Sequence, residues 1–411
     1  MIRSTRIGRF AYLLLALMVL PLSAVVAQEV DREKIVNALA EMGFENVGYT
    51  EDEEEIIFTI QNSAYRIQGV GVAKALDLIQ KEGLPNQKSC CVILLDNNIP
   101  QISVRYNNEQ SGDSLATVAP RDWETSYDLG DSWKKVRKNK VKNSSLYKVD
   151  ILIYPQFSFA NYVITQIYTA LLDFCPSVEV SLWKGSKIAA QIKIPVYNDG
   201  YGALESKVHP GHITLSQRFR LPYNIFARAT VGFFSNGRYG VDVDLKMPLR
   251  NEQFTVLGRM GLTGACYWDA FKLHYDPAMT FTWALGGSFY WKRYNTEFTA
   301  KAEQWLLKEF GGRFDMIRHF RYCSVGLYAM VTDKAPMNGG FRFQLLLPPY
   351  KYKRFKNQYI PRVNVSPNMG IAYNAGNERK YYKEYRAEAS DNIMQANSFN
   401  PYFIKTELLK H

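Results

Sequence analysis

The sequence predicts a mainly β protein, in which a transmembrane antiparallel β-barrel follows a small α+β domain. Three observations predict this fold: an export signal at the N-terminus, a long series of strands in which apolar and polar residues alternate, and charges along the polar side of those strands. After the N-terminus, no apolar run approaches the ~20 residues that a membrane-spanning helix needs. A chain of this kind can cross a bilayer only as a closed barrel, which pairs every backbone group.

Residues 1–27 have the form of a signal peptide. Three arginines within the first nine residues precede an apolar run over 10–22, and Val25-Val26-Ala27 fits a cleavage site. The run is much shorter than the ~20 residues of a membrane anchor. We therefore expect export, with a mature chain that begins at Gln28.

Residues 28–110 are predicted to form a small α+β domain in the periplasm. Asp31 is placed to cap a helix that runs to Met42, and a second helix is expected over Val72–Lys81. Short strands are expected over Val47–Thr50, Ile56–Gln61, Cys91–Leu95 and Ile102–Tyr106. Two helices with several short strands suggest a ferredoxin-like domain whose role is binding or docking.

Residues 111–147 are predicted to be a basic, polar linker. Seven basic residues and no acidic one lie between Lys134 and Lys148, and the whole chain carries a formal net charge of +11. A charge run of this kind is either a solvated linker or a segment close to anionic head groups or a polyanion. For an exported protein, the partners of a basic surface are outer-membrane lipid, lipopolysaccharide or acidic polysaccharide rather than nucleic acid.

The hairpin around residue 236 shows the alternation most clearly. Its apolar set should face lipid and its charged set the lumen, and these sets are Tyr239, Val241, Val243 and Leu245 against Arg238, Asp242, Asp244 and Lys246. Ser-Asn-Gly-Arg before the second strand is a tight-turn signal. We expect Arg228 and Arg259, on the neighbouring strands, to be charge partners of the aspartates.

The same alternation continues over residues 148–347, which are predicted to form the barrel. About twelve strands of roughly ten residues each are expected, a length that suits a tilted strand crossing the hydrocarbon layer. A soluble β-sandwich or lipocalin-like barrel is the alternative, but its second face could not pack so many charges. The lumen-facing candidates for ligand contact are Arg228, Arg238, Asp242, Asp244, Arg259, Glu297, Lys301, Glu303 and Arg342.

Residues 348–411 lose the pattern and are predicted to be a C-terminal extension. The apolar residues between Val363 and Tyr373 suggest one or two further strands, which would bring the barrel to about fourteen. Tyr381-Tyr382, Lys383 and Tyr385 suggest a helix or a plug instead.

The sequence predicts no catalytic residues, no metal and no cofactor. His209 and His212 have no carboxylate or cysteine at ligand spacing, and none of the five cysteines has the spacing of a metal site. Glu297 and Glu303 would lie roughly 20 Å apart on one strand, too far for the two carboxylates of a glycosidase.

Segments spread over the predicted barrel also carry a resemblance to a known family; they are Val180–Gly185, Ile192–Tyr197, Leu215–Gln217, Gly232–Phe234, Tyr239–Val241, Phe310–Phe314 and Val325–Asp333. They resemble the hairpins and late strands of the YjbH-like outer-membrane proteins, and the N-terminal domain with Tyr65-Arg66 is similar too. The resemblance implies a role in exopolysaccharide production and export at the outer membrane of a Gram-negative bacterium. It supplies no catalytic residues.

Three functions therefore remain open at the level of sequence. The first is a non-enzymatic barrel that assists the export or assembly of exopolysaccharide, whose mixed-charge lumen with tyrosine and tryptophan binds sugars. The second is a scaffold barrel whose periplasmic domain docks an export or secretion complex. The third is an enzyme that acts on lipid or glycan in the lumen.

Overall fold

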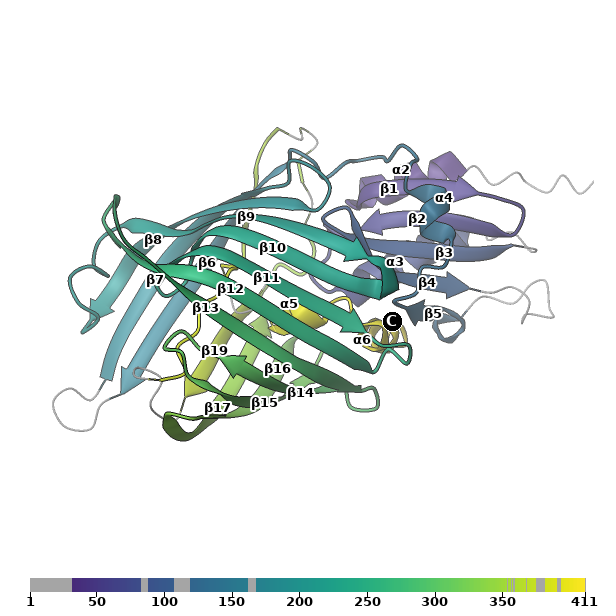
Figure 1. Ribbon diagram of the computed structural model, residues 1–411. Helices are drawn as coiled ribbons and strands as arrows, with labels where there is room; N and C mark the ends of the chain where they lie inside the picture. Colours follow the sequence, from purple (N-terminus) through teal and green to yellow (C-terminus); the bar gives the residue numbers. More distant parts are fainter. Residues whose placement is uncertain are drawn as a thin grey trace, which may run out of the picture.

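The structure of the protein, a computed structural model, describes residues 32–82, 88–106, 119–161, 168–352, 354–355, 357, 359–366, 368–374, 381–389 and 393–410. Within these residues the protein is mainly β, with one 5-stranded and one 14-stranded sheet (Figure 1). The predicted signal peptide lies outside the described residues. No helix of the described part is long and apolar enough to span a membrane.

The N-terminal domain is built on the smaller sheet, whose strands lie in chain order β1-β2-β3-β4-β5. Its elements are α2 (Arg32–Met42), β1 (Glu45–Glu51), β2 (Glu55–Gln61), α3 (Gln68–Glu82), β3 (Ser89–Asp96), β4 (Ile99–Tyr106), η2 (Pro120–Asp122), β5 (Glu124–Ser126) and α4 (Ser132–Val136). Neighbouring strands are antiparallel except β2 and β3, which α3 connects in parallel. The order α-β-β-α-β-β differs from the β-α-β-β-α-β of a ferredoxin-like fold, so that part of the prediction is wrong.

Both faces of the smaller sheet are covered, which explains its almost continuous apolar strands. Ile35 of α2 and Val72 of α3 lie in the core on one face, and Val136 of α4 packs with Ile57 and Ile93 on the other. The predicted helices and strands of this domain are present, but the order in which the strands pair depends on which face of the sheet each helix covers. Periodicity within one element does not contain that information.

The prediction of a linker over 111–147 is wrong for its described part, residues 119–147. Trp123 is fully buried in the main core of the domain, and Tyr127 lies beside it. The short strand β5 pairs with β4, and Val136 anchors α4. A few apolar side chains thus tie a strongly basic segment to the domain, while its lysines remain on the surface.

The 14-stranded sheet contains the twelve strands expected over 148–347 and two more. The twelve are β6 (Val149–Asn161), β7 (Tyr168–Val180), β8 (Ser186–Asp199), β9 (His209–Leu221), β10 (Ile225–Phe234), β11 (Arg238–Pro248), β12 (Phe254–Asp269), β13 (Lys272–Trp291), β14 (Thr296–Gln304), β15 (Phe310–His319), β16 (Cys323–Thr332) and β17 (Ala335–Leu346), each antiparallel to the next. β18 (Arg362–Val365) pairs in parallel with β6, and β19 (Asn368–Asn374) pairs with β17. The two edge strands of the sheet are therefore consecutive in the chain.

The turn between β10 and β11 follows from its sequence. Asn236 and Gly237 have φ of 55° and 60°, the left-handed conformation that two-residue hairpin turns require and that Asn-Gly supplies most easily. The register then places Arg228 opposite Asp244 and Thr230 opposite Asp242. The predicted hairpin is confirmed.

The larger sheet is curved, and its two faces have the reverse of the usual polarity. We call the face that carries Asp242 the concave face and the opposite one the outer face (Figure 1). Large apolar side chains are exposed on the outer face, among them Val178, Ile213, Leu215, Val231, Val241, Leu245, Val256, Met260, Leu262, Phe281, Leu285, Phe314, Leu327 and Phe343. Buried polar side chains lie on the concave face, among them Asp173, Glu179, Gln191, His212, Thr230, Asp242, Thr263, Arg313 and Asp315.

The two ends of the larger sheet differ in their surroundings. At one end, which we call the domain end, the turns contact the N-terminal domain: Asn97 Nδ2 donates to the carbonyl of Ser186, and Glu252 accepts from Ser126. The connection between β9 and β10 at this end contains η3 (Pro222–Asn224). The opposite end, which we call the far end, includes the turn at residue 236.

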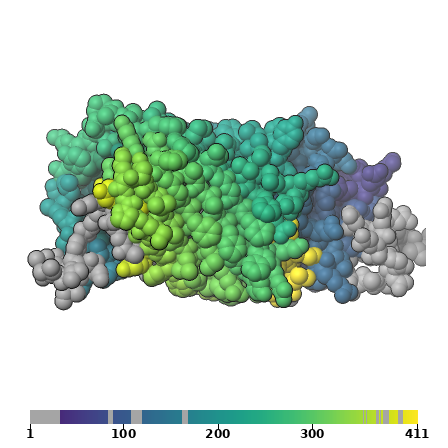
Figure 2. All heavy atoms as spheres, turned by 60° about the horizontal axis from the view of Figure 1, so that its bottom comes forward, coloured from purple at the N-terminus to yellow at the C-terminus, as the bar shows by residue number. Residues whose placement is uncertain are grey.

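After β19 the chain passes along the concave side of the sheet. β19 runs antiparallel to β17 and therefore ends at the far end. Residues 381–389, which we call the internal segment, then contact the concave face, and α5 (Ile393–Asn397) and α6 (Pro401–Leu408) follow at the domain end (Figure 1). In a space-filling view the yellow C-terminal residues show only near the two ends of the sheet (Figure 2).

The last helix, α6, belongs to the N-terminal domain as much as to the larger sheet. Asn400 caps it by accepting from the backbone N–H groups of Tyr402 and Phe403, and Ile404 is fully buried in the core of the N-terminal domain. On the other side Glu407, also fully buried, lies 3.0 Å from Arg321 in the turn between β15 and β16. The C-terminus thus holds the two parts of the molecule together.

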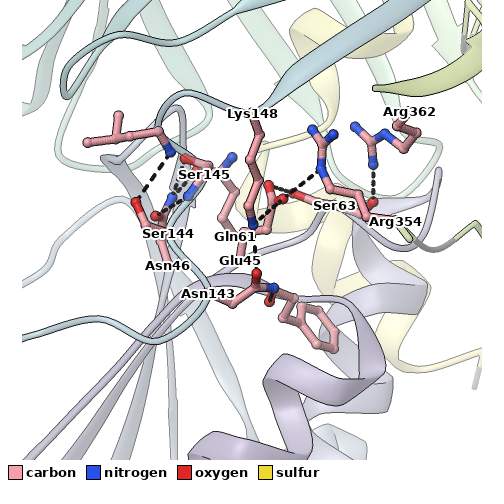
Figure 3. A network of polar contacts seen from close by, with 12 residues as sticks. Glu45, Asn46, Gln61, Ser63, Asn143, Ser144, Ser145, Lys148, Arg354 and Arg362 are labelled. Carbon is pink, nitrogen blue, oxygen red and sulfur yellow. Dashed lines mark hydrogen bonds and ion pairs between the residues drawn. The ribbon is translucent and has the colours of Figure 1, made fainter. Parts of the chain in front are cut away.

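A buried ionic network makes a second connection between the two parts (Figure 3). Glu45, at the start of β1, accepts from Lys148 and from Arg354, each at 3.0 Å, and from Ser63 at 2.6 Å. Arg354 also lies 2.7 Å from Asp150 of β6. Burial by itself would raise the pKa of Glu45, but the two cations outweigh it, so that the pKa of this carboxyl lies below its ordinary value.

Removing this carboxylate should destabilise the protein in a pH-dependent way. Glu45→Gln is expected to lower the free energy of unfolding by about 3 kcal/mol at pH 7, because Lys148 would remain buried without its anion. A carboxyl with a lowered folded pKa contributes stability above its ordinary pKa of 4.5, and that stability is lost as the pH falls through the folded value. Urea unfolding of the variant and the wild type should therefore converge in strong acid.

The matched control for this measurement is Glu41→Gln, which removes an exposed carboxylate at the end of α2. It should leave both the stability and its pH dependence unchanged. An effect of the control as large as that of Glu45→Gln, or a difference that persists at low pH, would contradict the assignment.

Candidate functional site

The principal cavity of the larger sheet lies between the internal segment and strands β10–β15. Its volume is about 480 Å³, and charged side chains dominate its lining. Eight of the nine candidates predicted from the sequence line it: Arg228, Asp242, Asp244, Arg259, Glu297, Lys301, Glu303 and Arg342. The ninth, Arg238, lies near the far end instead and donates to the carbonyl and hydroxyl oxygens of Thr263.

Cross-strand ion pairs organise the wall of the cavity. Arg228 Nε lies 2.8 Å from Asp244, and Arg259 Nε lies 2.9 Å from Asp242. The expected pairing of these aspartates with Arg228 and Arg259 is therefore confirmed. The register causes it, because Asp244 lies directly between Arg228 on β10 and Arg259 on β12.

A third ionic group lies on β15, and the candidate set predicted from the sequence did not include it. Arg313 lies 2.9 Å from Asp315 on the same strand and 2.8 Å from Glu384 of the internal segment. Arg313 and Asp315 stand two residues apart and therefore share a face, which was a usable signal. Glu384 lies outside any periodic stretch, and only the path of the chain places it here.

The internal segment supplies a second carboxylate to the wall. Glu388 forms an ion pair with Arg228 and lies 3.6 Å from Arg218 of β9. Between the two glutamates, the Tyr385 hydroxyl donates to Asp242 at 2.6 Å, and the Arg259 guanidinium lies 4.6 Å from the centre of the Tyr385 ring. Tyr385 is thus held both by a hydrogen bond to Asp242 and by a cation–π contact with Arg259.

The wall also binds the backbone of the internal segment. Donors reach three successive carbonyl oxygens: Asn236 Nδ2 to Glu384 at 2.6 Å, Arg259 Nη2 to Tyr385 at 3.1 Å, and His212 Nε2 to Arg386 at 3.2 Å. Ser235 N–H donates to the Arg386 carbonyl as well. The internal segment is in no strand of the sheet, so its contacts resemble those of a bound linear molecule.

Two further candidates, Glu297 and Glu303, have different surroundings. Glu297 lies 3.8 Å from His319, which is otherwise bonded to Ser324. Glu303 has one buried carboxylate oxygen without a hydrogen-bond partner among the described residues. Within the part of the chain that the structure describes, no group of three or more His, Cys, Asp or Glu side chains could hold a metal ion.

Comparisons with known proteins add no identification. No protein family, no curated protein and no solved structure matches the chain. The function must therefore be inferred from the polarity of the sheet and the chemistry of its interior.

Replacing Asp242 should lower the stability of the protein more than replacing Asp244. Asp242 is 2% exposed and binds both Arg259 and Tyr385, so Asp242→Asn is expected to cost about 3 kcal/mol by leaving Arg259 short of its anion. Asp244→Asn, on the same face of the same strand but half-exposed, should cost at most about 1 kcal/mol. Denaturant unfolding of the two variants tests this order, which equal losses would contradict.

Proposed function

We propose that this protein is an outer-membrane β-barrel of a Gram-negative bacterium that assists the export or assembly of exopolysaccharide without catalysing a reaction. The observation that carries the proposal is the reversed polarity of the larger sheet. Met260 is 49% and Val241 46% exposed on the outer face, whereas Asp242 and Arg313 are buried on the concave face. A soluble sheet protein buries the apolar set, and a barrel in lipid does the opposite.

The extent of the apolar surface supports a membrane location. Soluble monomers rarely expose a contiguous apolar patch above a few hundred Å², but here large apolar side chains are exposed on the strands from β7 to β17. A hydrocarbon environment covers such a surface without any partner protein. The basic charge that the sequence carries is suited to anionic head groups at its borders.

Aromatic side chains gather at both ends of the outer face, as in the girdles of membrane barrels. Exposed aromatics near the domain end include Tyr147, Trp183, Tyr223, Trp291, Phe320 and Tyr322. Near the far end they include Phe157, Phe159, Tyr168, Tyr197, Tyr267, Phe271 and Tyr275. The amphipathic rings of tyrosine and tryptophan prefer the head-group level, so the two groups mark the two borders of a lipid layer.

The strand order supports a barrel of fourteen strands. The number is even, β6 to β17 are antiparallel to one another in succession, and the two edge strands β18 and β19 are consecutive in the chain, although β18 pairs with β6 in parallel. Short connections occur at both ends of the sheet, for example 222–224 at the domain end and 235–237 at the far end, so turn length does not orient it. We place the N-terminal domain in the periplasm because the export signal predicted from the sequence comes directly before it.

The interior suits a polar polymer. Arginine and carboxylate groups line the cavity together with Trp305 and Tyr385, a combination that binds sugars through hydroxyl hydrogen bonds and ring contacts. The resemblance of the barrel hairpins to YjbH-like proteins also supports a role in exopolysaccharide export. Ser324 and His319 are hydrogen-bonded as a nucleophile and its base would be. Both are buried and neither lines the cavity, which argues against the lumen enzyme.

A scaffold barrel that docks a secretion or envelope complex is the second candidate. The observation that favours it is the internal segment, which fills much of the interior, together with the firm attachment of the N-terminal domain through α6 and Glu45. A barrel of this kind would present the domain at a fixed distance from the membrane.

The membrane location predicts a large effect for one charge on the outer face. Met260→Arg, in the middle of β12, should cost about 2–4 kcal/mol when the protein unfolds from a bilayer. Its control, Val141→Arg, changes another exposed apolar residue (37% exposed) outside the larger sheet and should stay within about 0.5 kcal/mol. Urea unfolding from phospholipid vesicles measures both. A Met260→Arg protein as stable as the control would refute the membrane location.

The polysaccharide role predicts the phenotype of a deletion. Cells without the protein should lose most of their surface exopolysaccharide, and the wild-type gene should restore it. The charge-neutral exchange Lys301→Gln/Glu303→Gln, in the cavity lining, should restore less. Normal polysaccharide in the deletion strain, with loss of an envelope protein complex instead, would favour the scaffold function. Full restoration by the double variant would show that Lys301 and Glu303 are not needed for the polysaccharide role.

A further inference from the structure

The internal segment is held in the same way that a receptor holds a ligand. It presents two carboxylates four residues apart, Glu384 and Glu388, and each meets arginine on the wall of the sheet. Its backbone carbonyls accept from Asn236 and Arg259, and its hydroxyl at Tyr385 donates to the wall. Carboxylates, acceptor oxygens and a hydroxyl along a linear chain are also the groups of an acidic polysaccharide.

The arginine positions are suited to carboxylates in particular. Arg218 and Arg228 converge on Glu388 from adjacent strands, β9 and β10, which pair these two residues directly. Two guanidinium groups side by side repel each other unless an anion lies between them. Each guanidinium also has a second carboxylate, Asp96 for Arg218 and Asp244 for Arg228. Because the planar guanidinium fork matches the geometry of a carboxylate, the space between the two arginines is a carboxylate site, which Glu388 occupies.

We propose that the wall arginines around Glu384 and Glu388 bind the carboxylates of a linear acidic polysaccharide, and that the internal segment occupies these positions as a built-in substitute until the polymer displaces it. This inference rests on the proposed function. It defines the substrate class as a polymer of uronic acids. It also explains why the chain passes through the interior, since Glu384 and Glu388 add to the anions that Asp96, Asp244 and Asp315 supply to these arginines.

Displacement of the segment is compatible with its anchors. At the far end Tyr382 is buried against Trp305, and after the segment Ile404 is buried in the N-terminal domain. Between these anchors the segment is held by the ionic and polar contacts described above and by small apolar contacts, with Tyr385 and Ala387 beside Phe234 and with Ala389 beside Tyr154. The cavity of about 480 Å³ adjoins it. The segment can therefore move aside into that space while both of its ends stay in place.

Competition between the segment and the polymer gives a measurable consequence. A ligand that must wait for a minor, open state binds with an affinity reduced by the fraction of that state. Glu384→Gln/Glu388→Gln weakens the hold of the segment and leaves the wall arginines intact. Binding of fluorescent oligogalacturonate to the purified full-length protein, followed by anisotropy at low salt, should therefore tighten by about tenfold.

The control is Glu41→Gln/Glu53→Gln, which removes the same two charges from exposed positions of the N-terminal domain. It should leave the affinity unchanged, and an equal gain would show that net charge alone is responsible. Adding Arg228→Gln to the first variant should abolish the gain. An unchanged affinity in Glu384→Gln/Glu388→Gln overturns the proposal, and so does an equal gain with polyphosphate or with an uncharged glucose oligomer.

A reversible tether tests the same idea without altering the glutamates. Ser235 and Arg386 are hydrogen-bonded to each other through backbone N–H and carbonyl groups and through the Ser235 hydroxyl, so cysteines at these positions are placed for a disulfide. Ser235→Cys/Arg386→Cys should bind oligogalacturonate at least about tenfold more weakly when oxidised than when reduced. The wild type, as the control, should bind equally well under both conditions. If the variant also binds oligogalacturonate with the same affinity when oxidised and when reduced, the displacement proposal is wrong.

The two proposals can fail separately. If the binding assays show no gain but the deletion strain lacks exopolysaccharide, the substitute role of the segment is wrong and the proposed function stands. If binding tightens as expected but the deletion strain keeps its polysaccharide, the carboxylate site stands and the export function is wrong.

Discussion

The pairing of buried charge on the concave face is the constraint on which the rest of the structure depends. Arg313 is buried and Arg228 and Arg259 are partly buried, and an unpaired buried cation costs several kcal/mol. Strands β11 and β15 supply part of the required negative charge through Asp242, Asp244 and Asp315, which a slip of one residue would turn to the outer face. The charges therefore specify the register of the sheet as strictly as an apolar core does in a soluble protein.

The wall does not satisfy all of this demand, and the C-terminus supplies the rest. Glu384 and Glu388 come from a segment that follows the last strand, and beyond them α6 completes the core of the N-terminal domain. A domain formed at the start of the chain thus needs the end of the chain, and the intervening segment must pass along the concave side. The C-terminal residues therefore connect the interior of the larger sheet to the core of the N-terminal domain.

The sequence predicts the elements of this protein better than their assembly. The alternation gives the strands and the two faces, and eight of the nine candidates that it selected line the cavity, because a period of two fixes the side of each residue. The prediction for Arg238 is wrong because a residue must have the right position along its strand, as well as the right face, to line the cavity. The pairing order of the N-terminal domain, the burial of Trp123 and the path of Glu384 depend on contacts between distant segments, which no local pattern records.

The kind of contact decides what the internal segment can do. Apolar contacts are cooperative and hard to exchange, since breaking them exposes a whole surface to water. Ionic contacts beside a polar cavity are exchangeable one at a time, because another anion can take the place of each carboxylate and salt screens the remainder. The segment combines both, with Tyr382 and Ile404 as apolar anchors at its two ends and, between them, arginine–carboxylate pairs beside a few small apolar contacts. Such an arrangement holds the segment in the interior in the absence of an anion, yet lets a polyanion compete along its middle without unfolding either anchor.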